Sequence, residues 1–353
     1  MSTNTYQSRS ALTAIGLAEM IQGQAPPRGL FDADLGQRFY RNALEVARAV
    51  DDADLDFVSL SEHHSFPGLL QPNPALYAAA LSQVVKKAGI AWVGPIVSIH
   101  NPIRIAEEIA MLDQMLGPNR LTVYLLKGTP NEHLRYGYSP DEARERGQEA
   151  ALFIKKALTE PDPFDWEGKH WQFKNVSIWP GVTTRPHPLL YTSGSGPETV
   201  KFAADNGFGI AIHGGDVKWA KTTVQMYRDA CDNAGWRPTS NHVIARGACA
   251  IGESDAHAEE LKTRMSAQRD LEAYSAETIG SAEHGASARG NTAVLFPFML
   301  HGGKEAAIEQ AWEFARAGVG VADLIMQFGG LPHDEELAVI KRLGEVATAV
   351  RGF

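Results

Sequence analysis

Short apolar runs alternate with longer amphipathic stretches along almost the whole chain. The runs are apolar throughout, which is typical of strands buried on both faces of a parallel sheet. They lie at 14–20, 57–61, 91–99, 121–127, 189–193, 209–213, 243–250 and 321–327. The amphipathic stretches predict helices near 36–52, 74–88, 102–117, 140–159, 197–206, 216–234, 255–272, 303–318 and 333–350. Eight strands that alternate with helices favour an α/β fold of the TIM type, a (β/α)8 barrel, over a doubly wound sheet.

Two stretches interrupt this alternation. Residues 160–188 contain five prolines and three tryptophans, and predict an irregular excursion with a small hairpin that turns at Trp166-Glu167-Gly168. Residues 275–302 are rich in Ala, Ser, Gly and His before they become apolar, and form an insertion before the last βα unit. We interpret 275–302 as a candidate lid over the site, with an ordinary surface loop as the alternative. No linker is visible, and we predict a single domain over residues 1–353.

Composition and charge exclude several classes of protein. The 353 residues are 44% hydrophobic and 21% charged, which is typical of a globular protein. The 33 Lys+Arg and 42 Asp+Glu give a formal net charge of −9, and no basic run occurs. Binding to nucleic acid or to anionic membranes depends on clustered Lys and Arg, so we expect neither partner.

The cysteines and the N-terminus indicate a cytoplasmic protein. Cys231 and Cys249 are the only cysteines, so a disulfide scaffold and a Cys-x-x-Cys pair are both excluded. Residues 1–10 are polar and lack the apolar core of a signal peptide. The longest nearly apolar stretch, 89–99, is shorter than the roughly 20 residues that span a bilayer. We therefore expect a reducing, cytoplasmic environment.

The C-terminal ends of barrel strands carry the chemistry of this fold. The second apolar run ends in Glu62-His63-His64, which could supply a general acid or base, or only cap the strand. Neighbouring side chains on a strand point in opposite directions, so only one histidine can face the barrel axis easily. A metal site of Glu62, His63 and His100 is a weaker interpretation, because the spacing that places two imidazoles on one side is absent. We predict no metal.

Three further strand ends carry candidate binding groups. Pro95 predicts a bulge in the third strand, which could direct the backbone at a ligand, although most bulges bind none. Lys127-Gly128 ends the fourth strand, and a lone lysine there is usually only solvated. Ser193-Gly194-Ser195-Gly196 joins the fifth strand to a helix start, where free N–H groups can bind an anion or form a simple capped turn. Together, Lys127 and this turn predict a phosphate site.

Six segments resemble the bacterial luciferase-like flavin-dependent monooxygenases. They occur in the same order along the chain as in that family, and the resemblance covers nearly the whole chain. The most specific is Asn101-Pro102-Ile103-Arg104-Ile105-Ala106-Glu107-Glu108-Ile109-Ala110-Met111-Leu112-Asp113-Gln114-Met115. The others are Glu62-His63-His64, Asn119-Arg120-Leu121, Lys127-Gly128-Thr129-Pro130, Ser193-Gly194-Ser195-Gly196-Pro197-Glu198 and Phe328-Gly329-Gly330-Leu331-Pro332-His333.

The resemblance implies a two-component monooxygenase on an eightfold barrel with a late insertion. Such an enzyme takes reduced FMN from a separate flavin reductase, and the flavin reacts with O2 to form a hydroperoxide that oxygenates the substrate. The resemblance also implies a homodimer. Light emission is not implied, because Leu126 stands where luciferase has a cysteine. Trp166, Trp171 and the apolar segment 294–300 favour a small, apolar organic substrate.

The same resemblance assigns roles to individual residues. His63 matches the catalytic histidine of the family, which protects or protonates the peroxide. Lys127-Gly128 stands where the family has an arginine-glycine pair that binds the flavin phosphate. The remaining matches are Ser193, Gly194, Ser195 and Gly196 in the phosphate site, and Ile96, Val97 and Ser98 in the bulged strand under the flavin ring.

Lys127 is a departure from the family, and it leaves alternatives open. An arginine can form two parallel hydrogen bonds to a phosphate, whereas a lysine offers a single point charge. The change therefore weakens FMN binding or indicates a different flavin. The second hypothesis is therefore a deazaflavin (F420)-dependent oxidoreductase that transfers hydride. The third is a flavin-binding protein without catalysis. The Glu-His-His cluster favours the monooxygenase, while His63 and the lid-like insertion argue against the non-catalytic protein.

Overall fold

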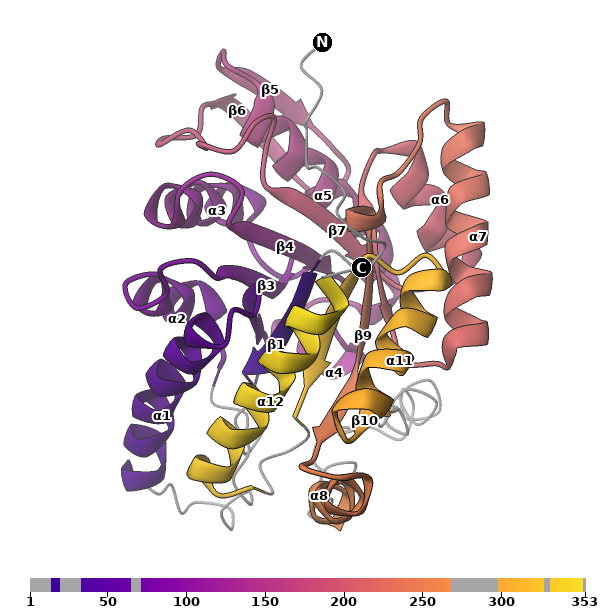
Figure 1. Ribbon diagram of the computed structural model, residues 1–353. Coiled ribbons are helices and arrows are strands. Elements are labelled where there is room, and N and C mark those ends of the chain that lie inside the picture. The colour runs from indigo at the N-terminus through magenta and orange to yellow at the C-terminus, as the bar shows by residue number, and fades with distance from the viewer. Residues whose placement is uncertain (1–13, 20–32, 65–70, 268–297, 327–330, 352–353) are drawn as a thin grey trace.

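Eight parallel strands close into a barrel in the computed structural model, which describes residues 14–19, 33–64, 71–267, 298–326 and 331–351 (Figure 1). Each strand pairs with the next, and the last pairs back to the first, which confirms the predicted (β/α)8 barrel. The barrel strands are β1 (Ala14–Glu19), β2 (Phe57–Ser61), β3 (Gly89–Ile96), β4 (Leu121–Leu126), β7 (Leu189–Ser193), β8 (Gly209–His213), β9 (Val243–Ile251) and β11 (Val321–Ile325).

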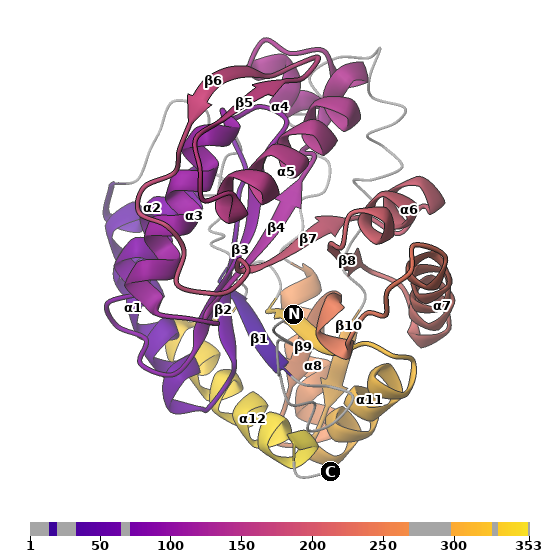
Figure 2. The same cartoon turned by 90° about the horizontal axis from the view of Figure 1, so that it is seen from above.

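Helices surround this barrel, as the view from above shows (Figure 2). In chain order they are α1 (Ala33–Asp52), α2 (Pro74–Leu81), α3 (Pro102–Leu116), α4 (Pro130–Arg135), α5 (Ala143–Thr159), α6 (Pro197–Asp205), α7 (Val217–Asn233), α8 (Asp255–Ala267), α11 (Lys304–Arg316) and α12 (His333–Arg351). None of the helices described is both long and apolar enough to cross a membrane.

Helix α2 ends at Leu81, whereas the sequence pattern predicts a helix up to residue 88. The buried carboxylate of Asp51 explains the difference. One of its oxygens accepts hydrogen bonds from the backbone N–H groups of Lys86, Lys87 and Ala88 at 2.7–3.1 Å. Because these N–H groups bind Asp51 rather than helix carbonyls, the chain leaves the helix and turns into β3.

The two interruptions have different outcomes. Residues 160–188 contain the predicted hairpin, formed by β5 (Phe164–Glu167) and β6 (Gln172–Val176). The predicted turn position is wrong: Trp166 and Glu167 are paired in the strand, and the turn runs from Gly168 to Trp171. Most of the candidate lid, 275–297, lies outside the described residues. Its last five residues form β10 (Phe298–Gly302), which pairs with the end of β9.

The barrel interior is filled by side chains, so it is a packed core and not a pore. Phe57, Tyr124, Tyr191 and Ile244 are among its buried residues. Gly16 of β1 leaves the space that the Phe57 ring occupies, because a Cβ there would lie 2.2 Å from ring carbons. Because the interior is filled, a ligand can bind only at an end of the barrel. The predicted site residues lie at the end where the parallel strands have their C-termini, which we call the mouth.

Candidate active site

His63 lies two residues beyond the end of β2 and pairs with a carboxylate of α4. Its Nδ1 lies 3.3 Å from Glu132 Oε1. The Glu132 carboxylate also accepts hydrogen bonds from the His64 N–H at 3.2 Å, the Thr129 N–H at 2.8 Å and the Thr129 hydroxyl at 2.9 Å. Burial raises the pKa of Glu132, but His63 and Thr129 outweigh it and lower the pKa to about 2.

An ionised, buried Glu132 fixes the orientation of the His63 ring by accepting its Nδ1–H. The side chain of His63 is 30% exposed, so the imidazole contacts Glu132 on its Nδ1 side and remains accessible from the mouth. A carboxylate that orients an imidazole in this way is the arrangement used for acid–base chemistry. Sequence reasoning missed Glu132. The only local signal was Thr129-x-x-Glu132, which predicts a helix start and does form a capping box.

His64 points to a second cluster. Its Nε2 lies 2.8 Å from Glu62 Oε1, and His100 Nε2 lies 2.6 Å from the same oxygen. The Tyr136 hydroxyl lies 2.9 Å from His64 Nδ1. Burial raises the pKa of Glu62, but the hydrogen bonds from His100 and His64 outweigh it, so the pKa is lowered. The two adjacent histidines therefore diverge, and the group near Glu62 contains His64 where the sequence interpretation had His63.

The predicted bulge in β3 is confirmed. Val93 and Gly94 both pair with Tyr124, so the register shifts there. Gly94 has φ +100, and a Cβ on it would lie 2.7 Å from the Cβ of Glu62, so this close approach requires glycine. The bulge thereby packs against the strand end that carries the two histidines.

The three residues expected under a flavin ring follow this bulge. Ile96 pairs with Leu126, and the Val97 N–H donates to the Leu126 carbonyl at 3.0 Å. Ser98 is fully buried, and its hydroxyl donates to the Lys127 carbonyl at 2.6 Å. Ser98 therefore ties the end of β3 to the end of β4 through protein contacts.

The expected phosphate-site residues come together at neighbouring strand ends. β4 and β7 pair with Leu125 opposite Thr192, so Lys127 and the 193–196 turn follow adjacent strands. Gly194 has φ +136, and Gly196 caps α6 without a side-chain hydrogen bond to its first N–H groups. Uncapped N–H groups at a helix start can bind an anion.

Arg144 is a second cation here that sequence reasoning missed. It lies in α5 and forms an ion pair with Glu198 in the first turn of α6. Loss of surrounding water and the charge of Arg144 lower the pKa of Lys127, which indicates that the two cations lie close together. No spacing rule could connect Arg144 with Lys127, because α5 approaches this turn only in the folded barrel.

Two further sets of polar contacts lie near the strand ends that carry the site residues. Arg246 forms an ion pair with Asp323 at 3.1 Å and donates to the Ser61 hydroxyl at 2.9 Å. On the other side, Ser193 Oγ lies 2.8 Å from His213 Nε2. Burial and then the charge of Arg246 lower the pKa of His213 to about 3, so this imidazole is neutral at pH 7.

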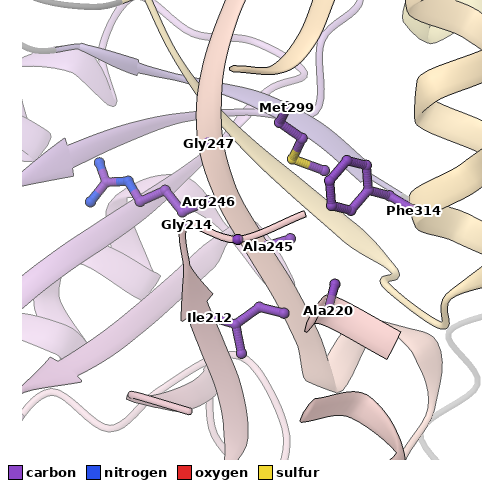
Figure 3. Close-up of a pocket in the computed structure, with 9 residues that line it drawn as sticks. Ile212, Gly214, Ala220, Ala245, Arg246, Gly247, Met299 and Phe314 are labelled. Carbon is purple, nitrogen blue, oxygen red and sulfur yellow. The ribbon is translucent and has the colours of Figure 1, made fainter. Parts of the chain in front are cut away.

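A small pocket lies elsewhere, between the barrel wall and helices α7 and α11 (Figure 3). Met299, Phe314 and Ala220 line it, and the Arg246 side chain extends away from them. The lining is mostly apolar or glycine. This pocket therefore offers little chemistry compared with the mouth.

The fold and the mouth define a class: a (β/α)8-barrel protein with a histidine–carboxylate pair and a candidate anion site at its C-terminal end. The family model described as luciferase-like monooxygenase matches residues 25–320. The chain belongs to the luciferase-like monooxygenase family.

Curated relatives match about half of the chain. An uncharacterized protein, y4wF, of Sinorhizobium fredii is 29% identical over 52% of this chain and 53% of its own length. The oxygenase component of the flavin-dependent trigonelline monooxygenase of Acinetobacter baylyi is 25% identical over 57% of this chain and 56% of its own. The chain thus spans about half the length of the curated relatives that it matches.

Solved structures share the fold over nearly the whole chain. The monooxygenase RslO1 of Streptomyces bottropensis has a TM-score of 0.80 at 21% identity, covering 96% of this chain and 99% of that one. The oxygenating constituent of 3,6-diketocamphane monooxygenase of Pseudomonas putida, in complex with FMN, has a TM-score of 0.74 at 18% identity, covering 96% and 98%. An F420-dependent secondary alcohol dehydrogenase has a TM-score of 0.71 at 18% identity, covering 96% and 99%.

Proposed function

We propose that this protein is the oxygenase component of a two-component flavin-dependent monooxygenase. It uses reduced FMN and O2 to oxygenate a small, apolar organic substrate through a flavin hydroperoxide. The observation that carries the proposal is the His63–Glu132 pair at the mouth of a luciferase-like barrel.

The residues at the mouth fit a flavin phosphate. Lys127 and Arg144 supply two positive charges, of which that of Arg144 also pairs with Glu198, and the uncapped start of α6 supplies N–H donors. Gly128 has φ +80, and a Cβ on it would lie 2.5 Å from a methyl of Ile96, so the chain comes close to the bulge here. Ser193, Gly194, Ser195 and Gly196 complete this end of the proposed site. A phosphate anchor fixes where the distant ring lies, which is over Ile96, Val97 and Ser98 in the proposal.

Bound reduced flavin would supply the activation of oxygen, and the protein supplies orientation and proton control. Glu132 keeps the Nδ1–H of His63 in place, so proton exchange with the mouth occurs at Nε2. We propose His63 as the catalytic residue and Glu132 as the positioning residue.

A deazaflavin-dependent hydride transfer is the second candidate. One observation favours it: the structural similarity to an F420-dependent dehydrogenase is nearly as high as that to the FMN complex. The single point charge of Lys127 agrees with a different cofactor, but Arg144 restores a second cation. The family match and the trigonelline relative favour the monooxygenase.

We further propose a separate flavin reductase and a homodimer as partners. Leu76 of α2 and Met111 and Met115 of α3 are large exposed apolar side chains, which favours contact with a second copy of the chain. Both cysteines are free and buried, which favours a reducing, cytoplasmic location. We propose that the whole chain forms one domain.

An anaerobic titration with reduced FMN, and separately with reduced deazaflavin, tests the proposal. We expect tight binding of reduced FMN and, after O2 is admitted, a transient absorbance of an oxygen adduct. Binding of reduced deazaflavin alone, with no adduct, would replace the proposal by hydride transfer. Unchanged product formation by His63→Ala with a coupled reductase would remove the catalytic assignment.

The phosphate site has its own test. Lys127→Met and Arg144→Met should each weaken FMN binding by roughly tenfold, because each removes a charged partner of the phosphate. Riboflavin lacks the phosphate and serves as the matched ligand, so its affinity should stay unchanged. Equal losses for FMN and riboflavin would show that these cations do not contact the phosphate.

A further inference from the structure

We propose that Glu62, His64 and His100 bind one divalent transition-metal ion of the zinc class, in place of the metal-free site that the sequence predicts. The three residues offer one carboxylate oxygen and two imidazole nitrogens, and these atoms all lie within 4.8 Å of one another. Carboxylate and imidazole are ligands that Zn²⁺ prefers. The site is distinct from the His63–Glu132 pair, and the inference goes beyond the proposed function.

Burial and charge favour an ion at this position. The Glu62 side chain is only 3% exposed, so a cation bound between it and the two imidazoles would offset a carboxylate charge in a buried setting. His64 is buried as well, which limits competition by water. The His100 side chain is 27% exposed, so an ion can reach the cluster from solvent on that side.

The three side chains lie closer together here than they would around a bound ion. Both Nε2 atoms contact the same oxygen of Glu62, at 2.8 Å and 2.6 Å. Ligand atoms about 2.1 Å from a tetrahedral ion lie about 3.4 Å from each other, so the two rings must each withdraw by roughly 0.7 Å. The two imidazole nitrogens lie within 4.8 Å of each other and of the carboxylate oxygen, and the ion would take the place of the hydrogen atoms that now lie between the ligands.

The surrounding contacts suit the ligand state of His64. To bind through Nε2, a neutral histidine carries its proton on Nδ1. The Tyr136 hydroxyl lies 2.9 Å from that Nδ1 and can accept the proton in a hydrogen bond. Partners of this kind orient metal-binding histidines and support affinity. Tyr136 is therefore the expected positioning residue of the site.

The experiment uses the full-length protein without flavin or O2, after treatment with a chelator. Co²⁺ is titrated at neutral pH and followed by its visible d–d absorption, and Zn²⁺ is then added as a competitor. We expect one Co²⁺ per chain, displaced by Zn²⁺, with affinity that falls as the pH falls because protons compete for the imidazoles.

Variants separate this site from other histidines. His100→Ala and Glu62→Gln should each lower the Co²⁺ affinity by 100-fold or more, as an order-of-magnitude estimate for loss of one of three ligands. Tyr136→Phe should lower it by roughly tenfold. His63→Ala is the matched control, because it removes an adjacent imidazole that is not a ligand, and it should bind Co²⁺ like the parent protein. His100 is partly exposed, so its replacement keeps the test valid if Glu62→Gln does not fold.

Two results would overturn the inference. One is the absence of a d–d band and of displaceable Co²⁺ at millimolar concentration in the parent protein. The other is equal binding by the parent and by His100→Ala, which would place the ion elsewhere. Neither result bears on the proposed monooxygenase activity, because no flavin or substrate is present in the assay.

Discussion

Replacing Glu132 by glutamine removes a buried negative charge that accepts four hydrogen bonds. Their donors are His63 Nδ1, the His64 N–H, and the N–H and hydroxyl of Thr129. Glutamine has nearly the same shape, but its NH2 group takes the place of one carboxylate oxygen. It cannot accept the two hydrogen bonds that this oxygen accepts. The change therefore isolates the charge and the hydrogen bonds from the packing.

The pKa of Glu132 gives the expected loss of stability. Folding lowers this pKa from its ordinary value of 4.5 to about 2. That shift corresponds to about 3 kcal/mol of stability at pH 7, since one pKa unit is worth about 1.4 kcal/mol. Because the folded pKa is depressed, the contribution is complete above pH 4.5 and disappears as the pH falls toward 2. By pH 3.5, about 1.4 kcal/mol of it is lost.

Urea unfolding of the parent protein and Glu132→Gln, followed by circular dichroism at several pH values, measures this difference. We expect a gap of about 3 kcal/mol at pH 7 that narrows below pH 4.5. Glu309→Gln is the matched control, because Glu309 forms an exposed ion pair with Arg316 that is worth about 1 kcal/mol or less. A gap at pH 7 below 1 kcal/mol, or one that does not change with pH, would refute the role assigned to the Glu132 charge.

Three further perturbations test the structure. Gly128→Ala places a methyl group 2.5 Å from a neighbouring side chain at φ +80, so it should lower the thermal stability more than Gly137→Ala, where φ is +78 and the space is open. Equal shifts in the midpoint of thermal unfolding would show that backbone strain alone accounts for the loss. His213 is half-buried and its pKa is lowered to about 3, so as the pH drops the unfolded state binds a proton first. Stability therefore falls by up to about 1.4 kcal/mol per pH unit as the pH drops from 6.5 toward 3. His213→Gln should make the urea midpoint less dependent on pH over this range, and an unchanged dependence would contradict the assignment. Asp323→Asn removes the buried carboxylate that pairs with Arg246 and should destabilise the protein by about 3–5 kcal/mol in the same assay. A loss below about 1 kcal/mol would show that the ion pair contributes little.

The barrel strands could be predicted from the sequence because each is a continuous run of apolar residues. Each strand is buried on both faces, so its run of apolar residues is visible without knowledge of its neighbours. The caps at Asn73 and Asn101, each followed by proline, fix two helix starts in the same way. The hairpin turn was displaced because pairing of Trp166 with Phe173, rather than the Trp-Glu-Gly sequence, sets its position.

The candidate site was only partly visible in the sequence. His63, Lys127 and the 193–196 turn end apolar runs, so the rule that barrel chemistry lies at strand ends finds them. Glu132 and Arg144 follow no such rule, since one lies in a short helix and the other in a long one. Their partners, His63 and Glu198, lie on other βα units of the chain.

The sequence by itself determined the barrel, its family and the residues that end its strands, because hydrophobic runs and motifs are properties of neighbouring residues. Only the tertiary structure decided which side chains meet. His63 turns to Glu132, while His64 turns to Glu62 and is joined there by His100, which is 38 residues from Glu62 in the chain. The physical reason is that strand direction and closure of the barrel set these contacts, and neither is encoded in residue spacing.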